Sequence, residues 1–130
     1  MMNNKLTVTN AIFQEKDNEL ILSLEQGYNT ASIKPMEQML VDSDHLAFVY
    51  ILEVNDDYTY LILPEHLWRY LRDANQANAI VKLTNGNSEL ILPAFHDELS
   101  YLVENISGNS NYGEHMVEKV ESIFQEMVQK

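Results

Sequence analysis

The stretch Leu61-Ile62-Leu63-Pro64 returns later in the chain as Leu90-Ile91-Leu92-Pro93. In both places an apolar run typical of a β-strand ends in a proline, and a helical pattern follows. Proline suits the first position of a helix because its missing N–H would have no partner there. A third copy, Leu20-Ile21-Leu22, lacks the proline. The repeat therefore predicts a chain of hairpin-plus-helix units.

Each copy has a partner strand before it, and turn residues separate the two. Asp17-Asn18, Asn55-Asp56 and Asn85-Gly86 all lie between apolar runs. Asn-Gly is the strongest of these signals, because a type I′ turn needs positive φ at both central residues. The run from His45 to Val54 is apolar on both faces, which predicts a strand covered on both sides, at least in part.

Apolar spacing predicts three helices before the C-terminal one. The segment from Met36 to Val41 follows Pro35 and carries an i, i+3, i+4 apolar stripe. Pro64 is expected to open a second helix that runs to about Asn75, and Pro93 is expected to open a third. Each of these prolines would occupy the position where a helix starts.

The last helix is expected to begin at Asn111 as its cap, with Glu114 in the capping-box position. Its predicted core stripe consists of Val117, Val120, Phe124 and Met127. Together the elements predict an α+β fold: three β-hairpin-plus-helix units forming a mainly antiparallel sheet of about six strands with helices packed on it, plus a C-terminal helix. Residues 1–130 contain no linker, so they are expected to form a single domain.

Charge and composition disfavour several classes of function. Twenty acidic residues against eight basic ones give a formal net charge of −12, which disfavours direct binding to nucleic acid or to anionic membranes. The sequence has no cysteine, which excludes disulfides and thiolate metal sites. A cytoplasmic protein is expected, since the first residues lack the apolar region of a signal peptide. The acidic residues are scattered, so an acidic nucleic-acid mimic is an alternative only.

Motifs for catalysis and for cofactors do not occur in the sequence. Its four glycines, at positions 27, 86, 108 and 113, cannot form a nucleotide-binding loop. Neither Gly-x-Ser-x-Gly nor His-Glu-x-x-His is present. The sequence therefore predicts no cofactor and no metal, and it points to no catalytic residue.

The densest group of potential ligands is Asp42-Ser43-Asp44-His45. Two carboxylates at i, i+2 in an extended loop could serve a hard cation such as magnesium. This supports the alternative of a small ligand-binding or metal-assisted enzyme domain that uses Asp42, Asp44 and His45. The favoured explanation is a turn, because Asp and Ser accept local backbone hydrogen bonds.

Two further groups are candidates for binding a ligand or a partner. The first is the set of aromatic residues around Tyr58 and Trp68, which are most often buried but form a binding patch when exposed. The second is the loop Gly108–Gly113, which supplies Asn111 and Tyr112 and also suits a plain connection between two helices.

Several stretches of the chain are typical of one family. They are Gln38-Met39-Leu40-Val41-Asp42-Ser43-Asp44, Tyr60-Leu61-Ile62, Phe95-His96, Asn105-Ile106 and Asn111-Tyr112-Gly113. Over residues 36–125 the chain resembles a small uncharacterised protein family of low-GC Gram-positive bacteria. The resemblance implies a cytosolic bacterial protein, and it supplies no activity, ligand or catalytic residue.

These observations favour one function over two alternatives. The favoured hypothesis is a non-enzymatic cytosolic protein-interaction or regulatory module with an acidic surface. Its partner would be a protein, with no direct contact to nucleic acid or membrane, and the chain itself would be a monomer or a homodimer. The alternatives are the ligand-binding or metal-assisted domain and the nucleic-acid mimic.

Overall fold

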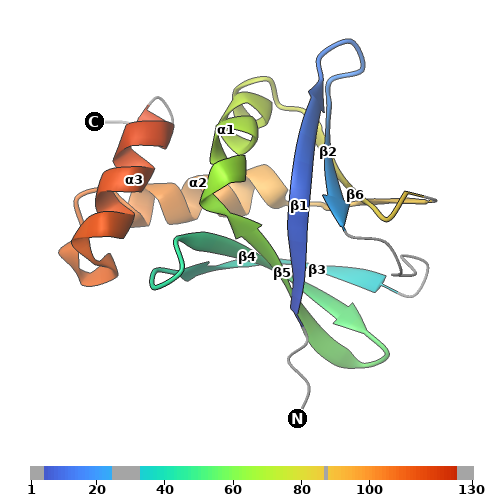
Figure 1. Ribbon diagram of the computed structural model, residues 1–130, viewed down its shortest axis with the longest axis horizontal. Helices are drawn as coiled ribbons and strands as arrows, with labels where there is room; N and C mark the ends of the chain where they lie inside the picture. The colour runs from blue at the N-terminus through green and yellow to red at the C-terminus, as the bar shows by residue number, and fades with distance from the viewer. Residues whose placement is uncertain (1–4, 25–32, 87, 126–130) are drawn as a thin grey trace.

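The computed structural model describes residues 5–24, 33–86 and 88–125. Seven strands form one sheet in the order β3-β4-β5-β1-β2-β6-β7, and three α-helices pack on it (Figure 1). The predicted α+β class and the C-terminal helix are confirmed, with one strand more than expected. In chain order the elements are β1 (Lys5–Gln14), β2 (Glu19–Leu24), β3 (Ile33–Asp42), β4 (Ala47–Val54), β5 (Asp57–Pro64), η2 (Glu65–Leu67), α1 (Trp68–Gln76), β6 (Ile80–Thr84), β7 (Glu89–Ile91), α2 (Phe95–Ile106), η3 (Ser110–Tyr112) and α3 (Glu114–Phe124).

The sheet is mainly antiparallel, as predicted. The hairpins β1–β2, β4–β5 and β6–β7 are antiparallel, and β3 pairs antiparallel with β4. Two parallel pairs, β1 with β5 and β2 with β6, join these hairpins side by side. The N-terminal hairpin therefore lies in the middle of the sheet, between the two hairpins that follow it in sequence.

The segment from Met36 to Val41 is part of strand β3, so the prediction of a helix there is wrong. In the β3–β4 pair the register shifts between Pro35 and Met39, around Glu37, whose φ is 58°. β3 is an edge strand, where proline is tolerated because one side of the backbone needs no ladder partner. A bulge interrupts the two-residue alternation of a strand. Here the resulting apolar spacing matched the i, i+3, i+4 pattern that is typical of a helix.

The Asn-Gly hairpin is confirmed, with a longer turn than predicted. Thr84 pairs with Glu89, so Asn85, Gly86 and Ser88 all lie in the connection, whereas a type I′ hairpin has two loop residues. Side chains close this turn: the backbone N–H of Gly86 donates to the Thr84 hydroxyl at 3.0 Å, and that of Ser88 donates to Asn85 Oδ1 at 3.1 Å.

The helices that follow the two prolines are confirmed, with differences at their starts. Pro64 ends β5 and precedes η2, which leads directly into α1. Pro93 is separated from α2 by Ala94, which takes a left-handed conformation with a φ of 61°. Tyr50 on β4 fixes this entry: its ring stacks on Phe95 and its hydroxyl donates to the carbonyl of Pro93 at 2.7 Å. Burial raises the pKa of the Tyr50 hydroxyl.

The last helix begins later than predicted. Asn111 lies inside the short helix η3, and Gly113, with a φ of 92°, immediately precedes α3. Because glycine adopts this positive φ at no steric cost, the chain turns at Gly113 and Glu114 becomes the first helical residue. Phe124 is buried, as predicted, whereas Met127 lies outside the described residues.

An aromatic cluster joins the sheet to two helices. Phe48 on β4 packs against Trp68 on α1, with 4.9 Å between ring centroids, and Phe124 on α3 packs against both rings at 6.0 and 5.8 Å. Residues 47–52 of β4 are all buried, which confirms that both faces of this strand are covered. The helices lie together on one side of the twisted sheet (Figure 1). In the described ranges, no helix has the length and apolarity required to cross a membrane.

Candidate functional site

Asp42 is the last residue of β3, and Ser43, Asp44 and His45 lie in the turn that leads to β4. The Asp42 carboxylate accepts a hydrogen bond from the backbone N–H of His45 at 3.3 Å, and its other oxygen lies 2.9 Å from His45 Nδ1. Asp44 is exposed beside this pair. Within the described part of the chain, no three His, Asp or Glu side chains are grouped to hold a metal ion. Local hydrogen bonds thus account for Asp42 and His45.

Folding brings Asp44 close to the loop that carries Tyr112. Both residues line a hollow of about 320 Å³, together with Ser43, Leu46 and the first residues of α3. Tyr112 is half-buried and packs on the core. Asn111 is exposed, and its backbone N–H donates to the side chain of Asn109. Asp44 and Tyr112, two candidate binding residues from distant parts of the sequence, therefore line the same hollow. Asn111 does not line it.

Tyr58 and Trp68 do not form one patch. Trp68 has an exposed fraction of 0%, and its indole N–H donates to the carbonyl of Leu63 at 3.1 Å. Trp68 lies in the first turn of α1 and its ring is buried in the core, so it adds nothing to an exposed patch around Tyr58. Tyr58 on β5 is 58% exposed.

The sheet face that carries Tyr58 holds a group of apolar side chains, which we call the outer patch. The register aligns Leu40, Val49 and Ile62 in one row, and Ile51 with Tyr60 in the next. Leu40, Tyr58 and Tyr60 are 44%, 58% and 37% exposed. Val49 and Ile51 are buried, yet they lie outside the core cluster that the sheet forms with the helices. The outer patch consists of Leu40, Val49, Ile51, Tyr58, Tyr60 and Ile62.

Charges on the same face nearly cancel. Lys34 pairs with Glu53 at 3.7 Å, and Lys82 pairs with Glu19 at 2.7 Å and with Glu89 at 3.4 Å. The hydrogen bond to Glu19 raises the pKa of Lys82. The remaining lysine of this face, Lys5, stands beside Tyr60, and Asp42 lies at the rim. The outer patch thus occupies a nearly neutral face of a chain whose formal net charge is −12.

A second feature that the sequence did not indicate is a groove of about 820 Å³ between α1 and α3. We call it the basic groove, because both arginines of the chain line it. Its lining residues include two histidines, His45 and His66, and five charged side chains, Glu65, Arg69, Arg72, Asp73 and Lys119.

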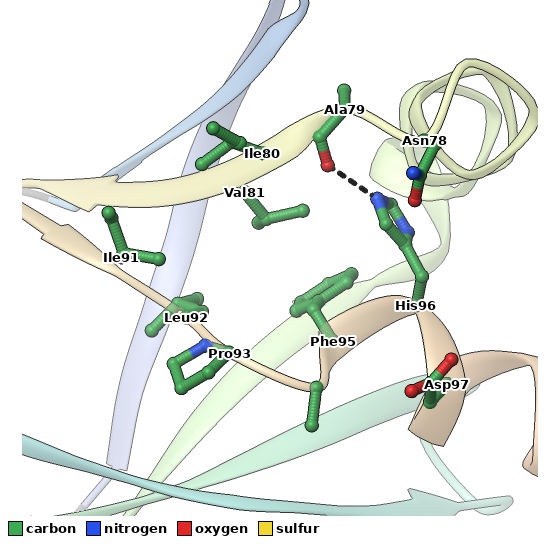
Figure 2. Close-up of a pocket in the computed structure, with 11 residues that line it drawn as sticks. Asn78, Ala79, Ile80, Val81, Ile91, Leu92, Pro93, Phe95, His96 and Asp97 are labelled. Atoms are coloured by element: carbon green, nitrogen blue, oxygen red, sulfur yellow. Dashed lines mark hydrogen bonds between the residues drawn. The ribbon is translucent and has the colours of Figure 1, made fainter.

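A third hollow, of about 250 Å³, lies where α2 begins beside β6 and β7 (Figure 2). His96 and Phe95 reach it from α2, Ile80 and Val81 line it from β6, and Leu92 lines it just after β7. His96 Nε2 lies 2.6 Å from the carbonyl oxygen of Ala79. A carbonyl oxygen can only accept a hydrogen bond, so in the neutral ring Nε2 carries the proton and Nδ1 is unprotonated. Nδ1 is buried without a partner in the described structure.

The pKa of His96 is lowered, first of all because burial disfavours its charged form. The unfolded chain therefore binds the second imidazole proton of His96, the one that makes the ring positively charged, more readily than the folded chain does. As a result, the free energy of unfolding falls as the pH drops below about 6.5. We expect His96→Gln to flatten the fall in melting temperature between pH 8 and pH 5.5, since glutamine can donate to Ala79 and does not titrate. His115→Gln, at an exposed position of α3, is the control. Equal slopes for wild type and His96→Gln would contradict the prediction.

Comparison with known proteins places the chain in a family. A family model described as a family of unknown function, UPF0738, matches residues 6–124. The chain belongs to the UPF0738 family. The UPF0738 protein YjbL of Bacillus subtilis is 46% identical over 123 residues, covering 95% of this chain and 99% of the relative. A UPF0738 protein of Bacillus licheniformis is 47% identical over the same shares of both chains.

These relatives confirm the resemblance to a family of low-GC Gram-positive bacteria. A UPF0738 protein of Geobacillus kaustophilus is 49% identical over 94 residues, 72% of this chain and 75% of the relative. No solved structure matches the chain. The UPF0738 match extends from β1 to the end of α3, so the outer patch and the whole lining of the basic groove lie within the region that defines the family.

Proposed function

We propose that the chain is a non-enzymatic protein-interaction or regulatory module of the cytoplasm, and that the outer patch is its binding surface. One observation carries this proposal: exposed Tyr58, Tyr60 and Leu40 surround buried Val49 and Ile51 on the sheet face turned away from the helices. Tyrosine is enriched at protein interfaces, because it adds apolar area and a hydrogen-bonding group at low cost in side-chain entropy.

The charge distribution supports the same surface. With a net charge of −12, most of the molecule repels other acidic proteins, whereas Lys34 and Glu53 beside the outer patch offset one another. A partner surface can therefore be dehydrated against Tyr60 and Leu40 with little electrostatic penalty. Dehydrated aromatic residues near the centre of an interface supply much of its binding free energy.

Site-specific photocrosslinking tests the proposal. A benzophenone amino acid is introduced at Tyr60, and at Tyr101 as the matched control, in chains expressed in living Bacillus cells. Tyr101 is also an exposed tyrosine, at 65%, but it lies on α2. We expect a discrete protein adduct from position 60 and none from position 101. An adduct of twice the chain's mass would identify the partner as a second copy.

A second variant tests whether the crosslinked adduct depends on the outer patch. Leu40→Asp, placed on β3 and separated from position 60 on β5 by strand β4, is expected to remove the adduct formed at position 60 while far-UV circular dichroism stays unchanged. Loss of the adduct would show that the apolar surface, and not proximity alone, drives binding. No adduct from position 60, or the same adduct from position 101, would refute the proposed function.

A further inference from the structure

The two arginines of this acidic chain lie three residues apart on one helix and line one groove. Arg69 and Arg72 come from α1, Lys119 faces them from α3, and His66 and His45 complete the basic side chains of the groove. The sequence contains eight lysines and arginines in all, and three of them are found here. Such a concentration is unexpected for scattered solubilising charges, which would be spread over the surface.

Two of these cations are already paired within the molecule. Lys119 Nζ lies 2.7 Å from Glu65 Oε2, which links α3 to η2. Arg72 contacts Asp73 through Nε and Nη2, each at 3.0 Å, and its Nη1 donates to the carbonyl of Ile123 at 3.5 Å. These bonds hold Arg72 and Lys119 in place at the two walls of the groove.

Arg69 is different. Among the described residues its guanidinium forms no ion pair or hydrogen bond, although Glu65 and Asp73 stand four residues before and after it on the same helical segment. Their carboxylates are taken by Lys119 and Arg72 instead. The side chain of Arg69 is exposed, so its five N–H donors are available to a ligand. His66 is exposed next to it and likewise has no partner in the described structure.

We propose that the basic groove binds a small molecule carrying a phosphate group, with Arg69 as the principal ligand. A guanidinium presents parallel N–H donors that match two oxygens of a phosphate at once. His66 can donate to a third oxygen, while Arg72 and Lys119 add positive potential from fixed positions. The half-buried Ile123 and the ring of Tyr70, which also line the groove, give the organic part of the ligand an apolar surface.

A small ligand fits better than a nucleic acid. The net charge of −12 repels a polyanion over the rest of the surface, whereas an anion with two or three charges experiences mainly the local field of the groove. The groove volume of about 820 Å³ also lies within the range of small-molecule sites.

Nuclear magnetic resonance of the arginine side chains tests the site directly. Because the chain has two arginines, its Nε–Hε region contains two signals, which Arg69→Lys assigns. Pyrophosphate and glucose 6-phosphate are titrated separately at constant ionic strength. We expect saturable shifts of the Arg69 signal with either probe, and the tighter one identifies a diphosphate or a phosphomonoester as the preferred group.

Two variants test whether the shift of the Arg69 signal comes from binding in the basic groove. Arg69→Gln is expected to weaken binding roughly tenfold or more, measured on backbone amides of α1, since hydrogen bonds to charged groups are worth more than neutral ones. Lys34→Gln removes one cation from the exposed outer face and is the matched control, with unchanged affinity expected. No saturable shift with either probe, equal weakening by both variants, or tighter binding of a short oligothymidylate than of pyrophosphate would overturn the proposal.

Discussion

Trp68→Ala is expected to lower the free energy of unfolding by about 3–5 kcal/mol, the range found when large aromatic side chains are removed from cores. Trp68 is fully buried and packs against the rings of Phe48 and Phe124. Its removal leaves a cavity where β4, α1 and α3 meet and also removes the indole donor to the carbonyl of Leu63. Urea denaturation followed by far-UV circular dichroism measures the change, because the variant has no other tryptophan to report by fluorescence.

Tyr70→Ala is the matched control for Trp68→Ala. Tyr70 lies on the same helix and is 44% exposed, so its removal is expected to change stability by about 0.5 kcal/mol or less. A loss below about 1 kcal/mol for Trp68→Ala would mean that α1 does not pack on the sheet through this ring. Equal losses for the two variants would contradict the assignment of Trp68 to the core rather than to a binding surface.

Local patterns were sufficient to predict most of the elements. In the two copies of Leu-Ile-Leu-Pro, the apolar run and the proline lie within a few residues of each other, so the strand and the helix after it follow from the sequence alone, although each α-helix starts later than predicted. The order of the hairpins in the sheet does not follow from the sequence. The parallel contact between Lys5–Thr7 and Tyr60–Ile62 joins distant segments whose alternation would suit other neighbours equally well. Strand alternation specifies a buried face, not the identity of the adjacent strand.

The error at Met36–Val41 has a physical cause in tertiary structure. The backbone N–H of Met39 donates to the carboxylate of Glu98 on α2 at 3.0 Å, where a regular strand would direct its polar groups to a neighbour. Glu37 takes a left-handed conformation in the bulge, although glutamate has no special preference for it. Both features depend on contacts with β4 and α2, so a local pattern cannot report them.

The candidate sites were harder to predict than the fold. Tyr58 was selected from sequence and belongs to the outer patch, but Leu40, which lies on the same face, was assigned to a helix. The basic groove combines Arg69 and Arg72 with Lys119, which lies on another helix far along the chain. Basic residues on a surface do not recur at a regular spacing from which a shared site could be predicted. Only the packing of α3 on α1 brings these three side chains together.

Phe124→Ala is the second substitution with a large expected effect, again a loss of about 3–5 kcal/mol in the free energy of unfolding. Phe124 is fully buried and attaches α3 to Phe48 and Trp68. Gln125→Ala, at the exposed neighbouring position, is the control and is expected to remain within about 0.5 kcal/mol of wild type. Thermal or urea denaturation distinguishes them, and equal stability of the two variants would show that α3 contributes little to the core.

The same substitution also tests how the basic groove is held together. Lys119 and Ile123 form the α3 wall of the groove, and the carbonyl of Ile123 accepts from Arg72. Loosening α3 should therefore weaken pyrophosphate binding even though Arg69 is unchanged, while crosslinking from Tyr60 on the other side of the sheet persists under conditions where the variant remains folded. If pyrophosphate binds Phe124→Ala as tightly as wild type, the phosphate contacts come from α1 alone, and α3 has no part in the site.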